Sequence, residues 1–305
     1  MKIIIFGGSG LIGQALVKHL VAEHEIAVVG RDVRKLKDCF GNTVNPMTWR
    51  AITTNVLANY DVAINLAGEN IGAKRWTSTQ KQKIINSRVS TTTKIAQKCA
   101  ELAERAPRLM NASAVGVYGL QTTIAAQNRV IYDEDSVLPS PPSDFLSQVG
   151  CEWECALVPA EKAGVSVVKL RFAVVLSKHG GALVKMLPSF QLGLGAVLGS
   201  GQQPFSWVAL NDVVAAITFL IHHPQASGAF NIVADEIVTQ KIFAKTLAKV
   251  LKKPCFLRIP SPMVHLLFGQ MGDELLLNGQ RVNAKRLRKL GFEFGYPSLE
   301  AALSL

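Results

Sequence analysis

The sequence lacks an apolar run long enough to cross a membrane. Its longest uncharged apolar stretch, VVAAITFLI at 213–221, is about half of the length that a transmembrane helix needs. Cysteine is also scarce. The five residues are scattered along the chain and do not show the paired spacing of a disulfide framework. The missing disulfide framework predicts a reducing compartment, and the missing apolar run predicts no membrane contact. We therefore expect a cytoplasmic location.

Metal-binding motifs are missing as well. The six histidines form no HxxxH or HxH group with acidic neighbours, and the cysteines have no metal-ligand spacing. We therefore expect no metal site from the sequence.

The formal net charge of +11 has two interpretations. It could indicate nucleic-acid binding, yet the basic residues are spread along the chain, with one dense cluster, KRLRKL, at 285–290. That cluster is typical of an amphipathic helix with Leu287 and Leu290 turned inward. We expect no nucleic-acid partner, and a positive surface that attracts an anionic cofactor or small-molecule substrate.

The first half of the chain alternates short apolar runs with helical periodicity, which is typical of βαβ units and a parallel sheet. Strand-like runs occupy 2–8, 25–30, 60–68, 108–119 and 165–177, and helical patterns occupy 11–22, 76–102 and 144–163. The fold class predicted is α/β, a Rossmann-type doubly wound parallel sheet with a smaller C-terminal substrate lobe. We assign 1–177 and 208–225 to the nucleotide-binding domain, and 178–207 and 226–305 to the lobe.

The segment GGSGLIG follows the first strand and precedes the first helix, so Gly7, Gly10 and Gly13 match a dinucleotide fingerprint. Gly7 permits the tight turn, Gly10 lets the backbone approach a pyrophosphate, and Gly13 permits close packing of helix and strand. The N-terminus of the helix then offers free N–H groups to the phosphates. The alternative is a purely structural turn.

The residue after the second strand decides which dinucleotide is preferred. An arginine there can pair with the 2′-phosphate of NADP, whereas a carboxylate binds the ribose hydroxyls of NAD. The segment VVGRD places Gly30 and Arg31 at this point, followed by Asp32. We predict NADP(H) rather than NAD(H); the alternative is a solvated arginine with Asp32 on the ribose.

A second loop, NLAG at 65–68, ends a later strand in small residues that could lie against the cofactor. The alternative is a tight strand exit. The residues predicted from the three loops to bind the cofactor are Gly7, Ser9, Gly10, Leu11, Ile12, Gly13, Gly30, Arg31, Leu66, Ala67 and Gly68.

With GGSGLIG, VVGRD, NLAG and ASAVGVYG in this order, the chain resembles the extended short-chain dehydrogenases/reductases. The segments NSRVSTT, LRFAVVLSKHGGAL and MLPSFQLGLGAVLGSGQQPFSWVALNDVV resemble the atypical "epimerase family" branch, whose members end in a small domain of unknown function. This resemblance implies NADP(H) binding, an uncharacterised substrate, and a place beside the cofactor for Arg88 and Val175.

The wider superfamily uses a Ser or Thr to orient a substrate oxygen and a Tyr, helped by a Lys four residues later, to transfer the proton. By resemblance, Ser113 and Tyr118 are candidates; the alternatives are a loop hydrogen bond and packing. Asp144 stands where the Tyr is expected and Gln148 where the Lys is expected, so Asp144 becomes a catalytic candidate. No Tyr-x-x-x-Lys pair occurs anywhere in the sequence.

Two functions therefore stay open. The first is an NADP(H)-dependent oxidoreductase or epimerase-like enzyme with a non-standard acid/base, acting on a small polar molecule. The second is a cofactor-binding sensor or interaction protein without turnover. Further candidates for lining a substrate site are Arg75, Lys185, Gln202 and Trp207. The oligomeric state is not predicted.

Overall fold

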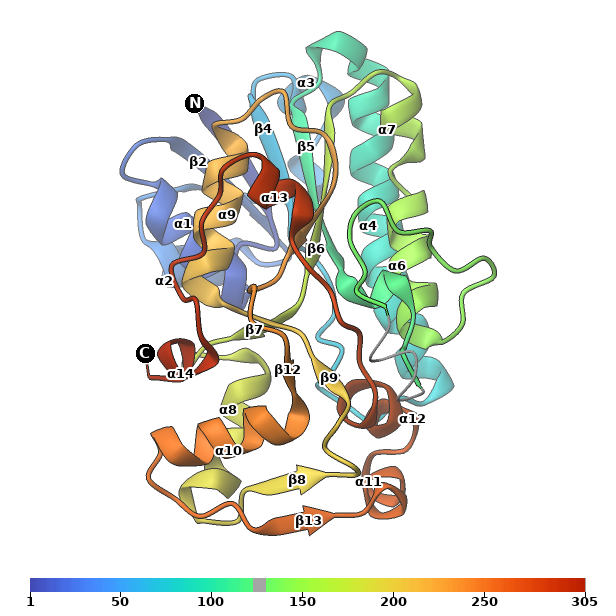
Figure 1. Cartoon of the computed structure of the whole chain (residues 1–305). Coiled ribbons are helices and arrows are strands. Elements are labelled where there is room, and N and C mark those ends of the chain that lie inside the picture. Colours follow the sequence, from blue (N-terminus) through green and yellow to red (C-terminus); the bar gives the residue numbers. More distant parts are fainter. Residues whose placement is uncertain (123–129, 305) are drawn as a thin grey trace.

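A seven-stranded parallel sheet forms the centre of the larger part of the molecule (Figure 1). The computed structural model describes residues 1–122 and 130–304. The strand order is β11-β6-β5-β4-β1-β2-β3, and every pairing is parallel. The strands are β1 (Lys2–Phe6), β2 (Glu25–Gly30), β3 (Asn45–Thr48), β4 (Val62–Asn65), β5 (Arg108–Ala114), β6 (Val167–Phe172) and β11 (Gly228–Ile232). The predicted doubly wound α/β fold is confirmed.

The central strands are apolar on both faces because helices cover both sides of the sheet. In β1, Ile3 and Ile5 face one layer of helices and Ile4 and Phe6 face the other, and all four are fully buried. One layer holds α1 (Leu11–Leu20), α2 (Val33–Phe40), α9 (Leu210–Ile221) and α13 (Lys285–Lys289). The other holds α3 (Thr54–Leu57), α4 (Ser78–Leu102), α6 (Phe145–Cys155) and α7 (Val158–Lys162).

A smaller lobe lies below the carboxyl ends of the sheet strands in Figure 1. It contains α8 (Gly181–Gln191), β8 (Ala196–Leu198), β9 (Pro204–Phe205), β12 (Val238–Thr239), α10 (Gln240–Val250), β13 (Leu257–Ile259), α11 (Ser261–Phe268), α12 (Gln270–Gly272) and α14 (Leu299–Leu303). Its core includes Phe190, Phe243 and Leu247. The parallel pair of β7 (Val174–Leu176) and β10 (Trp207–Ala209) joins it to the sheet.

Four short helical turns complete the described elements: η1 (Trp49–Ala51), η2 (Ala103–Arg105), η3 (Val115–Tyr118) and the π-turn η4 (Asp273–Leu277). No helix among the described residues is long and apolar enough to cross a bilayer.

The predicted lobe boundary was wrong for the strand at 228–232. This strand pairs with β6 as the edge of the main sheet, because Phe230 and Ile232 are apolar side chains that complete its core. The chain also returns later, and Leu287 and Phe292 pack on the same core. The tail is therefore divided between the two parts of the molecule.

The predicted helix at 76–102 is one continuous helix, α4. Its Ser/Thr-rich middle is tolerated because Thr92 is buried and bonded, accepting from the Nδ2 of Asn65 at 3.0 Å. The predicted helix at 144–163 divides into α6 and α7, where Pro159 occupies the first turn of α7, a position that proline tolerates.

Candidate functional site

The glycine loop lies between β1 and α1, next to the point where the strand order of the sheet reverses. Dinucleotides bind at this switch point in open parallel sheets. Gly10 is the N-cap of α1, and the first-turn amides of a helix have no intrahelical acceptors. Ser9 and Gly10 are exposed, while Leu11 and Ile12 are half-buried. The loop therefore offers free N–H groups to solvent or to an anion.

The three fingerprint glycines have different surroundings. Gly7 has a φ of +77°, and a Cβ there would lie 2.7 Å from the amide nitrogen of Ala67. A Cβ on Gly13 would lie 2.6 Å from the Cα of Gly8. On Gly10, the nearest atom to such a Cβ is the Gly7 carbonyl oxygen at 3.4 Å. Gly7 and Gly13 are thus required by the protein's own packing, whereas a Cβ on Gly10 would meet the protein only at ordinary van der Waals distance.

Arg31 follows β2 and its side chain is exposed, with no hydrogen-bond or ion-pair partner among the described residues. Gly30 lies against the side chain of Leu36, at the end of the strand. Asp32 is the N-cap of α2, and its Oδ1 accepts a hydrogen bond from the Arg34 amide at 2.9 Å. The carboxylate therefore already has a structural role, and the guanidinium of Arg31 is the free group at this position.

The loop after β4 lies between the glycine loop and Arg88. The Oδ1 of Asn65 accepts from the Ala67 amide at 3.2 Å, and the Leu66 amide donates to the Phe6 carbonyl at 2.9 Å. A Cβ on Gly68 would lie 3.3 Å from the guanidinium carbon of Arg88.

Arg88 is a cation with no bonded carboxylate among the described residues. Its Nη1 donates to the Ile84 carbonyl at 3.0 Å, and its guanidinium stacks 5.0 Å from the ring centroid of Trp153. Burial lowers the pKa of Arg88 to about 10, although the charge of Glu69 opposes that shift. The side chain is therefore still charged at neutral pH, next to the small-residue loop.

Val175 also lies near the glycine loop. A Cβ on Gly181 would lie 3.2 Å from the side chain of Leu11 and 3.4 Å from the Val175 carbonyl oxygen. Gly181, the first residue of α8, therefore lies against two predicted cofactor residues, Leu11 of α1 and Val175 of β7. Their contact with a cofactor remains a prediction.

Ser113 points into the layer between the sheet and α6. It is 2% exposed, and its hydroxyl donates to the Oε1 of Glu154 at 2.7 Å. Arg171 lies opposite Ser113 on the neighbouring strand. It donates two hydrogen bonds to the same carboxylate, from Nε to Oε1 at 2.8 Å and from Nη2 to Oε2 at 2.7 Å. The serine thus belongs to a buried ion pair.

Tyr118 extends this cluster. Its hydroxyl accepts from the Nη1 of Arg171 at 2.8 Å and donates to the Oδ1 of Asn231 at 2.9 Å. The ring is 2% exposed and stacks on Tyr132, with 5.2 Å between centroids. Burial raises the pKa of Tyr118, and the Arg171 cation opposes that shift. We call the connected side chains Ser113, Glu154, Arg171, Tyr118 and Asn231 the buried polar cluster.

Asp144 is a helix cap. One carboxylate oxygen accepts from the Ser147 amide at 2.8 Å, and the other accepts from the Leu120 amide at 2.9 Å and the Ser143 hydroxyl at 2.8 Å. The Ser147 hydroxyl bonds back to the Asp144 amide, which completes a capping box. This residue is placed before the first turn of α6.

The four further candidates are not equivalent. Trp207 is fully buried in the core of the lobe, so it cannot line a substrate site directly. The Nζ of Lys185 donates to the Gly72 carbonyl, and the Nη2 of Arg75 donates to the Leu266 carbonyl at 3.5 Å. Both cations therefore connect the loop after β4 to the smaller lobe. Gln202 is exposed in the loop before β9.

Sequence reasoning missed Glu154, Arg171 and Asn231. One signal was available, because Arg171 interrupts the apolar run VVKLRFAVV. A charged residue in a strand that is buried on both faces requires a buried partner. Its spacing could not identify Glu154, which comes from a helix 17 residues earlier.

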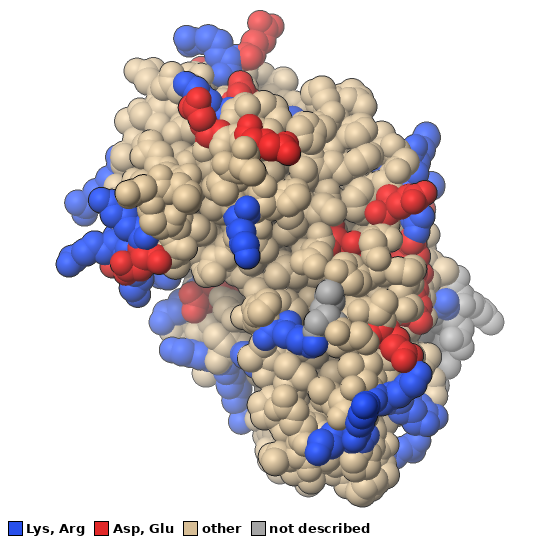
Figure 2. Space-filling model, turned by 90° about the vertical axis from the view of Figure 1, so that its left-hand side faces the viewer, with Lys and Arg blue, Asp and Glu red and all other residues tan. Residues whose placement is uncertain are grey.

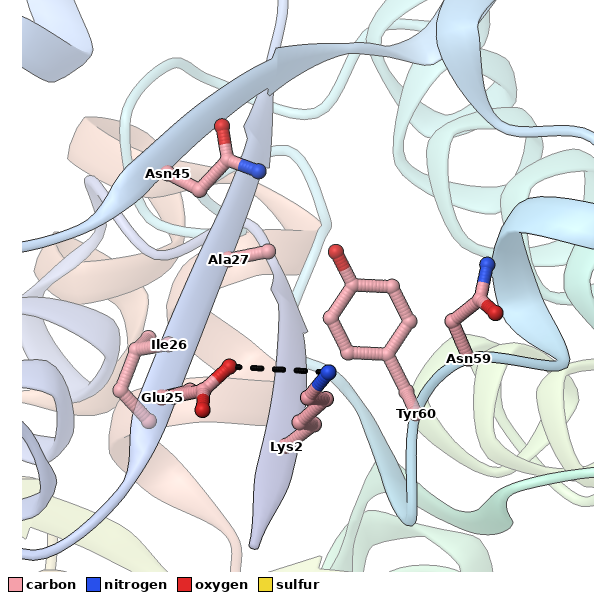
Figure 3. Close-up of a pocket in the computed structure, with 7 residues that line it drawn as sticks. All are labelled: Lys2, Glu25, Ile26, Ala27, Asn45, Asn59 and Tyr60. Carbon is pink, nitrogen blue, oxygen red and sulfur yellow. Dashed lines mark ion pairs between the residues drawn. The ribbon is translucent and has the colours of Figure 1, made fainter.

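A cavity of about 210 Å³ lies away from this region (Figure 3). It opens at the amino ends of the strands, where Lys2 and Glu25 form an ion pair at 3.8 Å beside Tyr60. Ligands of open parallel sheets bind at the carboxyl ends, so we do not assign the dinucleotide to this cavity.

The positive charge is distributed. On the face drawn in Figure 2, Lys and Arg side chains stand in separate groups, several beside acidic side chains, with uncharged surface between them. A continuous basic stripe, which backbone binding of nucleic acid favours, is not seen on this face.

Comparisons with known proteins agree with this geometry. Residues 3–233 match the family described as "NAD dependent epimerase/dehydratase family", and residues 259–304 match the "Domain of unknown function (DUF1731)". The chain is 36% identical over 303 residues to the epimerase family protein Mb2239 of Mycobacterium bovis, covering 99% of this chain and 96% of that protein. It is also 36% identical over 309 residues to human epimerase family protein SDR39U1, covering 99% and 98%.

Solved structures give the same result. The crystal structure of human epimerase family protein SDR39U1 (isoform 2) with NADPH has a TM-score of 0.83 and 33% identity, covering 100% of this chain and 98% of that one. The UDP-glucuronic acid 4-epimerase of Bacillus cereus, at 15% identity and a TM-score of 0.74, shares the fold. The chain therefore belongs to the NAD dependent epimerase/dehydratase family, in the SDR39U1-like branch with a C-terminal DUF1731 domain.

Proposed function

We propose that this protein binds NADP(H) at the glycine loop and uses it as a redox cofactor on a small polar substrate. The observation that carries the proposal is the N-terminus of α1, where Ser9 and the N-cap Gly10 are exposed. Free helix amides and a positive dipole end suit a diphosphate. The human relative that was crystallised with NADPH supports the same ligand.

The choice of NADP(H) over NAD(H) rests on Arg31. Its guanidinium is exposed and unpaired within the described residues, at the end of the strand that follows α1. A free guanidinium can make two charge-assisted bonds to a 2′-phosphate. Asp32, the competing group, already caps α2.

Arg88 supports a phosphate-bearing ligand on the other side of the loop. It holds a positive charge next to Gly68 without a bonded carboxylate among the described residues. A buried charge without a counterion is costly, so an anionic ligand nearby would reduce that cost. In this proposal, Arg88 and Arg31 give the dinucleotide site positive charge on two sides.

The test compares binding of NADPH and NADH to wild type and Arg31→Ala by titration calorimetry. We expect about tenfold or greater loss of NADPH affinity, because one or two charge-assisted bonds are removed. NADH affinity should stay unchanged. The matched control is Arg34→Ala, which removes a neighbouring exposed guanidinium three residues later. Equal NADPH affinity in Arg31→Ala and wild type would contradict the assignment.

Turnover requires a proton donor, and each predicted donor already makes hydrogen bonds within the protein. Ser113 and Tyr118 are buried and bonded, and Asp144 is a cap. This observation favours a second candidate function, an NADP(H)-binding sensor or interaction protein without turnover.

A single assay separates the two candidates. The absorbance of bound NADPH is followed while small polar metabolites are added, with wild type and Ser113→Ala compared. Oxidation by one compound that is lost in Ser113→Ala supports the enzyme and a role for this serine. Oxidation retained in Ser113→Ala supports an enzyme with a different donor. A cofactor that is bound but never oxidised supports the sensor.

We further propose a reducing compartment such as the cytoplasm and no nucleic-acid or membrane partner. All five cysteines are free thiols in this structure, which suits that setting.

A further inference from the structure

Two histidines and a glutamate meet at the opposite end of the sheet strands from the glycine loop. Glu23 and His24 lie in the turn between α1 and β2, and His222 is the C-cap of α9. One carboxylate oxygen and one ring nitrogen from each histidine all lie within 4.8 Å of one another. The two imidazole rings are 5.9 Å apart and inclined by 44°.

The backbone holds these residues in place. The amides of Glu23 and His24 donate to the Leu20 carbonyl at 3.2 and 3.0 Å, and the His222 amide donates to the Thr218 and Phe219 carbonyls at 3.3 and 3.2 Å. α1 packs beside α9, so the two segments are fixed relative to each other (Figure 1).

His24 carries the feature that indicates a ligand. Its Nδ1 is shielded from solvent and has no hydrogen-bond partner among the described groups. A shielded polar nitrogen without a partner is costly, and a bound cation or water would satisfy it.

We propose that Glu23, His24 and His222 bind a divalent transition-metal ion, of which Zn²⁺ suits the donor set best. Two histidine nitrogens and one carboxylate oxygen, with a water molecule in the fourth position, form a common tetrahedral zinc site. Metal–ligand bonds of about 2.0–2.1 Å place the ligand atoms about 3.3 Å apart. Glu23 and His222 are exposed, so their side chains can make this adjustment.

The site is independent of the dinucleotide. It lies at the amino edge of the sheet, whereas the glycine loop lies at the carboxyl end of β1. A metal ion there would link the turn before β2 to the end of α9. The expected result is a more stable folded state, because an ion that binds only the folded chain stabilises it by mass action.

The test uses the full chain, Zn²⁺ and Co²⁺. We expect one equivalent of Zn²⁺ to bind by calorimetry, and Co²⁺ to show the strong visible absorption of a tetrahedral site. His222→Ala and His24→Gln should each lower the Zn²⁺ affinity by more than about tenfold, because each removes a ligand. The control is His179→Ala, which removes an exposed histidine in the turn before α8. This variant should bind Zn²⁺ as wild type does.

Thermal unfolding provides a second readout. Zn²⁺ should raise the melting temperature of wild type and of His179→Ala, but not of His222→Ala. Far-UV circular dichroism and NADPH binding confirm that each variant is folded. Wild type that binds no Zn²⁺, or a His222→Ala variant that binds it as tightly as wild type, would overturn the proposal. Both results leave the proposed NADP(H) function unaffected.

Discussion

Polar residues gather in two neighbouring regions near the carboxyl ends of the strands. In one region they are exposed, and in the other they are buried and hydrogen-bonded to one another. At the glycine loop, Ser9, Gly10 and Arg31 are exposed, and the Arg31 side chain has no partner within the described chain. In the buried polar cluster, Glu154 and Arg171 are almost fully buried and bonded to each other. A strand-end polar residue can thus serve a ligand or the fold, and its hydrogen-bond partners distinguish the two.

The sharpest way to break this comparison is to remove the cation of the buried cluster. Arg171→Met leaves the Glu154 carboxylate buried without its counterion, and we expect a loss of about 3–5 kcal/mol in the free energy of unfolding. Urea denaturation measures it. The matched variant is Arg171→Met with Glu154→Met, which removes both charges and should recover most of that loss. An Arg171→Met variant as stable as wild type would show that the buried polar cluster does not stabilise the fold.

The glycine loop gives the second test. In Gly13→Ala, the new Cβ would overlap Gly8, so we expect a cost of about 1–3 kcal/mol in stability and at least tenfold weaker NADPH binding. In Gly10→Ala, the Cβ meets no protein atom closer than 3.4 Å, so only NADPH affinity should fall. Unfolding curves and NADPH titration separate the two effects. Unchanged NADPH affinity in Gly10→Ala would mean that the ligand does not approach this position.

The smallest expected effect comes from an exposed group of charged side chains outside both regions. The side chains of Lys285 and Arg286 hold the pKa of Asp135 at about 2, below its ordinary value of 3.8. Because the folded pKa is depressed, the stabilisation is present above about pH 4 and is lost as the pH falls toward 2. Asp135→Asn should flatten the acid side of the stability–pH curve slightly.

The control for this test is Asp38→Asn, an exposed aspartate without an ion-pair partner in the described chain, which should keep the wild-type acid dependence. Thermal unfolding between pH 2 and pH 5 measures the stability of both variants. This range includes the folded pKa of Asp135, about 2, and its ordinary pKa of 3.8. Equal curves for wild type and Asp135→Asn would contradict the ion pair in solution.

The glycine loop could be predicted because its requirements are local. A strand, three spaced glycines and a helix are adjacent in sequence, and Gly7 and Gly13 adopt the close contacts that this pattern predicts. The roles of Ser113, Tyr118 and Asp144 could not be predicted in the same way. A serine at a strand end is compatible with a substrate contact or with a bond to a buried carboxylate, and only the tertiary structure shows the carboxylate, that of Glu154 on α6.

The sequence by itself determined the α/β class and the place of the glycine loop, because periodicity and spacing encode interactions between residues close along the chain. The family was indicated separately, by the resemblance of its motifs. Only the tertiary structure decided which polar side chains are free and which are satisfied. It also brought Glu23 and His24 to His222, nearly two hundred positions away, and added Gly228–Ile232 to the main sheet. Partners of this kind depend on how helices pack across a sheet, which no local pattern records.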